Sequence, residues 1–176
     1  MFPLVLGGVQ NDNIPNDSVT TSQKSDNERS YSYIEEESPY LNNRLETGTI
    51  VYKNSSISNQ KNSVVNVKTG YGGDIDYVVI IKKNNKIVRN SYIRSGDSKR
   101  FSLPAGTFQI FFYSGKGWDP NKQQANSDIK GGFVSNESFS KDGSVYLDNN
   151  ELSYELVPQV NGNFQADHSN RKEMFQ

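Results

Sequence analysis

The chain of 176 residues contains no cysteine and only one histidine, His168. The lack of cysteine excludes disulfide bonds, thiolate metal sites and cysteine nucleophiles. A Ser-His-Asp triad needs an imidazole that its neighbours hold rigidly, and His168 lies in a polar segment without such support. Asp74 and Asp76 share one strand face beside a predicted turn, but they match no motif for a catalytic pair or a calcium loop. We therefore expect a protein that is not an enzyme and that uses no metal or other cofactor.

An excess of charge of one sign is also absent, because 19 basic side chains stand against 20 acidic ones and the formal net charge is -1. Such a chain lacks the broad cationic field that attracts duplex nucleic acid or an anionic membrane surface. No stretch approaches the roughly 20 apolar residues of a membrane-spanning helix. The sequence therefore predicts no nucleic-acid partner and no membrane span.

A short apolar segment, residues 1–9, carries no basic residue ahead of it and is interrupted by Pro3. These features make a poor signal peptide, and nothing else in the sequence indicates a compartment. One interpretation is an anchoring arm, which docks on a protein partner or on another copy of the chain. Its docking end would consist of Phe2, Leu4, Val5 and Leu6. The alternative is a frayed terminus or a processing remnant.

Composition divides the chain into three parts. Residues 10–47 are rich in Asn, Asp, Ser, Thr, Gln and Glu, and their few apolar residues cannot offset the entropy of ordering the segment. We expect an extended or flexible N-terminal arm over residues 1–47, a folded domain over 48–165 and a polar tail over 166–176. Within the tail, residues 169–175 are compatible with a short helix that Ser169 caps.

Short β-branched and alternating segments, separated by turn signals, fill the folded domain. Residues 76–82 contain five consecutive apolar or aromatic residues, which is typical of a strand covered on both faces. Asn84 and Asn85 follow, and both tolerate the positive φ of a tight hairpin turn. Residues 143–147 are expected to pair with residues 152–160. The pattern predicts an all-β, antiparallel β-sandwich of about seven to nine short strands, Ig-like or transthyretin-like.

The strongest strand pattern lies immediately before a glycine-rich segment. Phe108, Ile110 and Phe112 alternate onto one face, which we expect to form the main core. Phe111 and Tyr113 point to the opposite face and therefore need a cover. The arm, the glycine-rich segment or a neighbouring chain could provide it.

The glycine-rich segment, residues 114–132, is expected to form a long loop. Loops carry binding residues more often than the elements that they connect. An exposed Trp118, with Asp119 and with Tyr71 or Tyr113 nearby, would stack on a sugar or on a partner side chain. The alternative is that Trp118 folds back and fills the end of the sandwich.

A group of basic residues surrounds the predicted hairpin. Its members are Lys82, Lys83, Lys86, Arg89, Arg94, Lys99 and Arg100. Basic side chains on an edge strand prevent unwanted pairing with other sheets. We favour this interpretation over an anionic partner.

Half of the chain, mostly from residue 77 onward, carries a family resemblance. The segments concerned are Ser38–Tyr40, Tyr77–Lys82, Tyr92–Gly96, Leu103–Phe108, Phe112–Lys122, Gly131–Val134, Glu137–Asp142, Leu152–Leu156 and Asn161–Phe164. On these segments the chain resembles a set of small β proteins common in Bacteroidota genomes. That family has no established activity, so the resemblance implies a β fold rather than a function. The Leu103–Phe108 corner is also similar to a corner of transthyretin-like and carboxypeptidase-regulatory-like sandwiches, which is an analogy of fold alone.

Two classes of function remain open. The first is a non-catalytic interaction or assembly module that its N-terminal arm carries into a larger structure, for example as a structural or decoration component of a bacteriophage virion. The second is a surface or periplasmic module that binds glycan or peptide through the Trp118 loop. The sequence does not choose between them.

Overall fold

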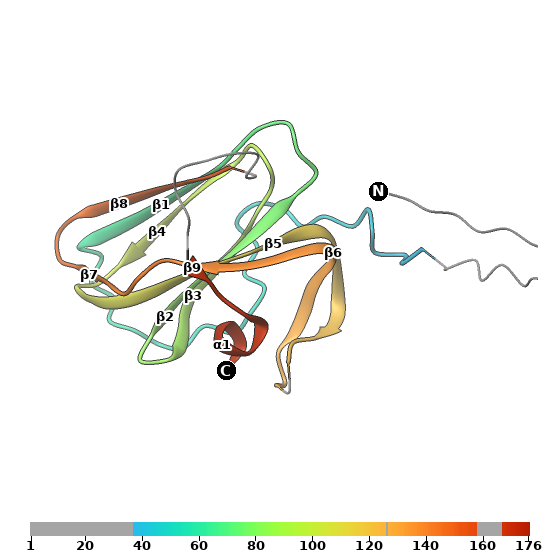
Figure 1. Cartoon of the computed structure of the whole chain (residues 1–176). Coiled ribbons are helices and arrows are strands. Elements are labelled where there is room, and N and C mark those ends of the chain that lie inside the picture. The colour runs from blue at the N-terminus through green and yellow to red at the C-terminus, as the bar shows by residue number, and fades with distance from the viewer. Residues whose placement is uncertain (1–36, 126, 158–166) are drawn as a thin grey trace, which may run out of the picture. The chain divides into compact units, whose positions relative to one another are not determined.

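The computed structural model describes residues 37–125, 127–157 and 167–176, all within one unit of the chain, residues 36–176. In these residues the chain forms nine strands and one short helix (Figure 1). In chain order they are β1 (Ser63–Thr69), β2 (Asp76–Lys83), β3 (Lys86–Ile93), β4 (Ser98–Leu103), β5 (Gly106–Gln123), β6 (Lys130–Lys141), β7 (Val145–Leu147), β8 (Glu151–Leu156), β9 (Asp167–His168) and α1 (Arg171–Phe175).

The strands form two sheets that pack face to face. In Figure 1, β8, β1 and β4 lie together as one layer above β2 and β3 of the other layer. The smaller sheet has the order β4-β1-β8, and the larger has the order β3-β2-β5-β6-β9, with β7 paired to the start of β5. Strands β1 and β8 run parallel, whereas the other pairings in the described part are antiparallel. The structure confirms the predicted all-β sandwich.

The first hydrophobic core fills the space between the two sheets. Phe108, Ile110 and Phe112 of β5 are buried there, as their alternation predicts. They meet Val65 and Val67, which point inward from β1 of the smaller sheet. Fully burying a side chain of this size stabilises a fold by about 1.5–3 kcal/mol, so these facing rows hold the two layers together.

The second hydrophobic core lies on the other face of the larger sheet. Strand β2 contributes to both cores, because Val79 points to the first and Val78 to the second. The apolar run in β2 therefore reflects burial on both faces, as predicted. Phe111 and Tyr113 of β5 point into the second core. Tyr52 and the residues of α1 pack against them, so the same chain supplies the cover.

Helix α1, near the C-terminus, covers part of the second core with Met174 and Phe175. Its N-cap is Asn170, whose side chain accepts a hydrogen bond from the Glu173 amide. Lys82 of β2 donates from Nζ to the carbonyl oxygens of Glu173 and Gln176 at 3.0 and 2.9 Å. Burial lowers the pKa of Lys82, and the nearby Glu173 carboxylate acts in the opposite direction. Residues 167–176 thus belong to the fold, where the sequence predicts a polar tail, and Asn170 takes the capping role expected of Ser169.

Two strand assignments differ from the sequence prediction. Residues 114–123 continue β5 and pair with β6 in a long hairpin instead of forming a loop. Gly115 is needed in this hairpin because a Cβ atom there would overlap the Phe133 side chain. The predicted pairing of residues 143–147 with 152–160 is wrong, since β7 pairs with β5 and β8 with β1. Strand β8 lies beside β1 on the side opposite β4. In this position its alternating apolar side chains, Leu152, Tyr154 and Leu156, pack against the first core.

Candidate functional site

The residues predicted for recognition do not come together on the surface. Trp118 is 3% exposed and packs edge-to-face against Tyr92 and Phe133 at ring-centroid distances of 5.6 and 5.2 Å. Tyr113 is fully buried, whereas Tyr71 is 81% exposed. Asp119 is partly exposed, and its carboxylate accepts a hydrogen bond from the Asn121 amide. Trp118 is therefore buried in the second core, on the outer face of the larger sheet, and these four residues form no exposed stacking surface.

The predicted docking end of the arm, Phe2, Leu4, Val5 and Leu6, lies outside the described residues. The later part of the predicted arm is described, and it is packed against the larger sheet. We name residues 38–52 the anchor segment. The folded unit thus begins about ten residues earlier than composition suggests, with its boundary at residues 35 and 36.

The first contact of the anchor segment is with β5. The Trp118 amide donates a hydrogen bond to the Asn43 carbonyl at 2.9 Å. The Asn43 side chain donates to the Trp118 carbonyl at 2.6 Å. The carbonyl oxygens of Tyr40 and Leu41 lie directly over Gly117, where a Cβ atom would be 2.6 Å from each. Gly117 therefore permits the close approach of the anchor segment.

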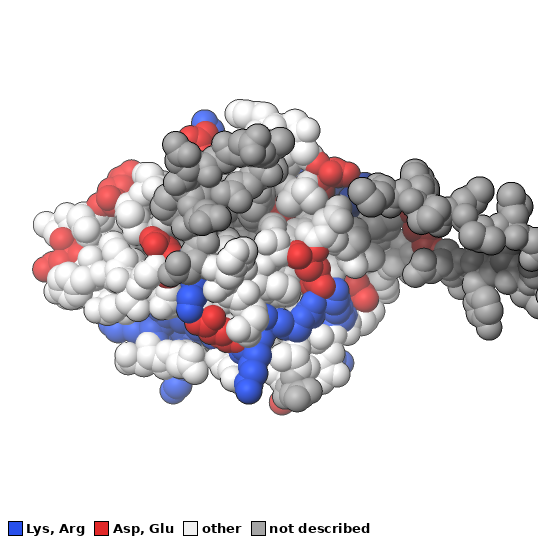
Figure 2. Space-filling model, in the orientation of Figure 1, with Lys and Arg blue, Asp and Glu red and all other residues white. Residues whose placement is uncertain are grey.

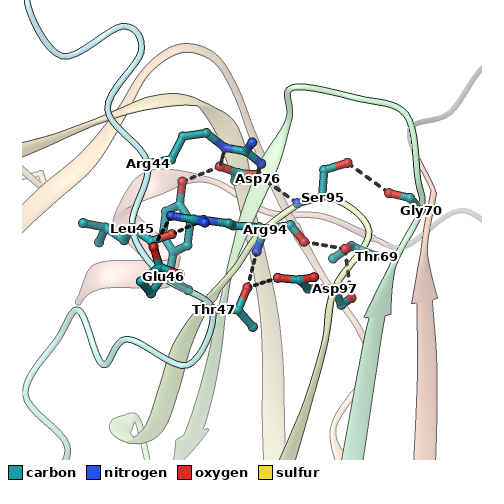
Figure 3. Close-up of polar contacts among 11 residues, drawn as sticks. Arg44, Leu45, Glu46, Thr47, Thr69, Gly70, Asp76, Arg94, Ser95 and Asp97 are labelled. Carbon is teal, nitrogen blue, oxygen red and sulfur yellow. Dashed lines mark hydrogen bonds and ion pairs between the residues drawn. The ribbon is translucent and has the colours of Figure 1, made fainter.

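The second contact is a buried carboxylate, Asp76, at the start of β2 (Figure 3). Asp76 is 1% exposed. Arg44 of the anchor segment donates to it from Nε at 2.7 Å and also from Nη2. The Tyr92 hydroxyl donates at 2.6 Å and the Ser95 amide at 2.9 Å. Asp76 thus joins the anchor segment, β2, β3 and the turn after β3 at one point.

Electrostatics at this point favour the charged carboxylate. Burial raises the pKa of Asp76, but the hydrogen bonds from Arg44, Tyr92 and the Ser95 amide outweigh it, so the pKa lies below its ordinary value. The Asp76 hydrogen bond raises the pKa of Arg44. Burial, together with that same carboxylate, raises the pKa of Tyr92. The group therefore stays an ion pair with a neutral phenol at neutral pH.

A second set of bonds surrounds Arg94, which follows β3 (Figure 3). Arg94 donates from Nε to the Leu45 carbonyl at 2.7 Å and from its amide to the Thr47 hydroxyl at 3.0 Å. Its guanidinium also pairs with Glu46 at 2.6 Å. The Arg94 carbonyl accepts from the Thr69 hydroxyl of β1 at 2.8 Å. Arg94 therefore links the anchor segment to both sheets.

The third contact covers the edge of β3. The Gly48 amide donates to the Tyr92 carbonyl at 2.9 Å, and the Tyr92 amide donates to the Thr49 carbonyl at 2.8 Å. Asn90 continues this edge with its side chain, which accepts from the Val51 and Tyr52 amides and donates to the Tyr52 carbonyl at 2.7 Å. Residues 48–52 thus pair with β3 partly through its backbone and partly through the Asn90 side chain.

The polar contacts of the site attach the anchor segment to the larger sheet. Among the described residues, each buried side-chain nitrogen or oxygen has a hydrogen-bond partner, and no group of acidic or histidine side chains is placed to hold a metal ion. The described part of the chain also contains no helix that is long and apolar enough to cross a membrane. The Asp76 carboxylate accepts its hydrogen bonds from protein donors, so the site fixes the anchor segment to the larger sheet.

Sequence reasoning missed the three residues that matter most here, Arg44, Asp76 and Asn90. In the sequence, Asp76 lies only beside a predicted turn and outside any motif, although an acid directly before a buried apolar run was a usable signal. Arg44 lies in a polar segment and shows no signal of its own. Asn90 interrupts the alternation of β3, and such a polar residue at a buried strand position needs a partner.

Comparison with known proteins adds no identity. No protein-family model, no curated protein and no solved structure matches this chain. The resemblance to β proteins of Bacteroidota therefore stays a prediction.

The Gly117→Ala variant tests the attachment of the anchor segment. Gly117 has a φ of +68°, and alanine in this region costs about 1–2 kcal/mol. We expect a loss in the free energy of unfolding that exceeds this value, because the added Cβ also overlaps the Tyr40 and Leu41 carbonyl oxygens, together with faster hydrogen exchange across residues 38–52. Gly72→Ala is the matched control, since Gly72 has a φ of +86° and open space around its Cβ position. Equal exchange in the two variants would show that Gly117 does not seat the anchor segment.

Proposed function

We propose that this protein is a non-catalytic β-sandwich interaction module, which joins a larger assembly through residues 1–36 of the predicted N-terminal arm. The observation that carries the proposal is the clamp of Arg44 on Asp76, which fixes the chain to the core directly after the arm. A bacteriophage virion is one example of such an assembly, and this example comes from the sequence analysis alone.

The clamp supports this function because it determines where the arm starts. A tether that begins at a fixed point loses less entropy on docking than one that begins in a loose chain. Hydrogen bonds to charged groups contribute about 1.5–3 kcal/mol each, and Asp76 accepts bonds from three different residues. A force that a bound partner exerts on the arm is therefore carried to the larger sheet through the Arg44–Asp76 contact.

The apolar residues of the arm are the proposed contact with the partner. Burying side chains such as Phe2, Leu4, Val5 and Leu6 contributes about 1.5–3 kcal/mol each. Part of this is lost to ordering the polar residues that follow. The sum is sufficient to hold a folded module on a neighbouring protein or on another copy of the chain.

Removing residues 1–36 tests the proposal. This truncation keeps Arg44 and the anchor segment, so we expect a loss of at most about 1 kcal/mol in stability, which corresponds to a few degrees in melting temperature. Size-exclusion chromatography with light scattering, on the purified protein and in native lysate, should show that the truncated protein no longer joins the assembly.

A longer truncation, of residues 1–47, provides the control. It also removes Arg44 and most of the contacts to β5, so it should be clearly less stable than the first truncation. A full-length protein that stays monomeric in lysate, with no partner recovered through residues 1–36, would exclude the assembly function. Truncated protein that still enters the assembly would assign the contact to the sandwich itself.

A further inference from the structure

Strand β4 presents a free edge next to a groove. It is the terminal strand of the smaller sheet, and its backbone bonds within the described residues go to β1 alone. The edge of the larger sheet on this side, β3, is covered by the anchor segment instead. An uncovered edge has a row of unpaired N–H and C=O groups, to which another strand can add.

The groove beside this edge has a volume of about 250 Å³. Its lining includes Lys99 and Arg100 of β4, together with Ile50 and Asn54. Lys61 and Arg89 complete its basic lining. Ile50 is 63% exposed, so the groove offers an apolar side chain among four cationic ones.

The charge of the groove is not neutralised within the described residues. Among the described residues, no acidic side chain lines it, and Lys61, Arg89 and Lys99 make no ion pair. Arg100 pairs with Glu151 at 3.6 Å, and both side chains are more than half exposed. Such an exposed pair is weak and can be exchanged for another carboxylate.

Several basic residues elsewhere in the described part form ion pairs with acidic ones. On the face drawn in Figure 2, the Lys and Arg side chains form a band that acidic side chains interrupt. Glu137, for example, pairs with both Lys122 and Arg171, and Glu173 pairs with Lys141. The groove at β4 is distinguished by four cations with one exposed acidic partner between them.

We propose that this groove binds an extended acidic peptide, which adds as a strand to the free edge of β4. The backbone of the peptide pairs with the edge, and its carboxylates, at alternate positions, lie on the face of β4 that carries Lys99. Arg100, the next residue of β4, points to the opposite face. The side chains between the carboxylates point to the opposite face of the peptide. Six residues of β4 are available, which at about 3.3 Å per residue accommodates a segment of about 20 Å. The proposal does not rest on the arm, because all of its residues belong to the sandwich.

Strand addition is favoured over a general polyanion because the free edge and the cations lie on the same groove. A polysaccharide or a nucleic acid would use the cations but not the row of backbone groups. The backbone ladder provides the affinity in this mode of recognition, and the side chains provide the selection.

The test uses the full-length protein and a fluorescent peptide of ten residues in which glutamate and valine alternate. A second peptide has the same sequence with alternate backbone amides N-methylated, which removes the donors that a strand needs. We expect the first peptide to bind, measured by fluorescence anisotropy, and the second to bind at least about tenfold more weakly. Hydrogen exchange at residues 98–103 should slow with the first peptide alone.

Charge-reversal variants locate the contact. Lys99→Glu and Arg89→Glu should each weaken binding about tenfold or more, because they place like charges across the contact. Lys86→Glu makes the same change in charge at an exposed residue outside the groove, so it should change binding less than about threefold. Circular dichroism and melting curves establish that the variants remain folded.

Two results would overturn the proposal. Equal binding of the two peptides, with the same salt dependence for polyphosphate, would identify a general polyanion site without strand addition. No binding of the peptide, together with a dimer that Lys99→Glu dissociates, would show that a second copy of the chain occupies the groove.

Discussion

Replacing Trp118 with alanine is expected to lower the free energy of unfolding by about 3–5 kcal/mol, the usual cost of truncating a buried aromatic side chain. Trp118 is 3% exposed and packs against three aromatic rings, those of Tyr52, Tyr92 and Phe133. Its loss leaves a cavity under the anchor segment that the rigid strands on either side cannot close. Urea or guanidinium unfolding, followed by circular dichroism, measures the change.

Tyr71→Ala is the matched control for this variant. Tyr71 belongs to the same predicted recognition set, but it is 81% exposed, so its truncation should change stability by less than about 0.5 kcal/mol. The intrinsic fluorescence gives an independent measurement, since Trp118 is the one tryptophan of the chain. We expect a blue-shifted emission that moves to longer wavelength on unfolding. Near-neutral stability of Trp118→Ala, with red-shifted emission in the native state, would favour a surface role for this side chain.

The second large effect is expected from Arg44→Met, which should cost about 3 kcal/mol. The variant leaves the Asp76 carboxylate 1% exposed without its cation. Breaking a buried ion pair in this way costs about 3–5 kcal/mol, and the 41% exposure of the Arg44 side chain places the expectation at the low end. Lys68→Met is the control, because the Lys68–Glu155 pair is exposed and should contribute less than about 1 kcal/mol. An equal loss in the two variants would mean that the clamp does not hold the anchor segment.

The pH dependence of stability checks the same group. The pKa of Asp76 in the folded protein lies below its ordinary value, which is about 3.9 in the unfolded chain. Its contribution is therefore fully present above about pH 4 and is lost as the pH falls through the lower folded pKa. Asp74, which is exposed, and Glu173, which is partly exposed, also have lowered pKa values. The difference between the wild type and Asp76→Asn isolates Asp76, and this difference should shrink on acidification.

The strands of the cores were largely predictable from sequence. Alternation places Phe108, Ile110 and Phe112 on one face of β5, and the structure buries all three in the first core. The turn after β2 was predictable as well, since Asn84 and Asn85 adopt φ values of 50° and 60°. Such features follow from the two-residue period of a strand and from the local backbone preferences of single residues. They depend only on neighbours in the chain.

The candidate site could not be predicted to the same extent. Arg44 and Asp76 are 32 positions apart, and neither belongs to a motif. A polar segment such as residues 38–47 has the same composition whether it is mobile or held by specific hydrogen bonds. Its order depends on a few donors and acceptors of the sheet, which only the assembled fold brings into position.

The sequence by itself determined the all-β class, the strand that is covered on both faces, and the inward row of β5, because apolar periodicity acts through local geometry. The tertiary structure decided that Trp118 belongs to a long hairpin, that β8 pairs in parallel with β1, and that residues 38–52 and α1 cover the second core. Glycines that suggest a loop also serve where another chain segment must approach closely, as at Gly115 and Gly117. Which segment fills that space depends on residues far away in the sequence, and hydrophobic burial rewards any cover that fits.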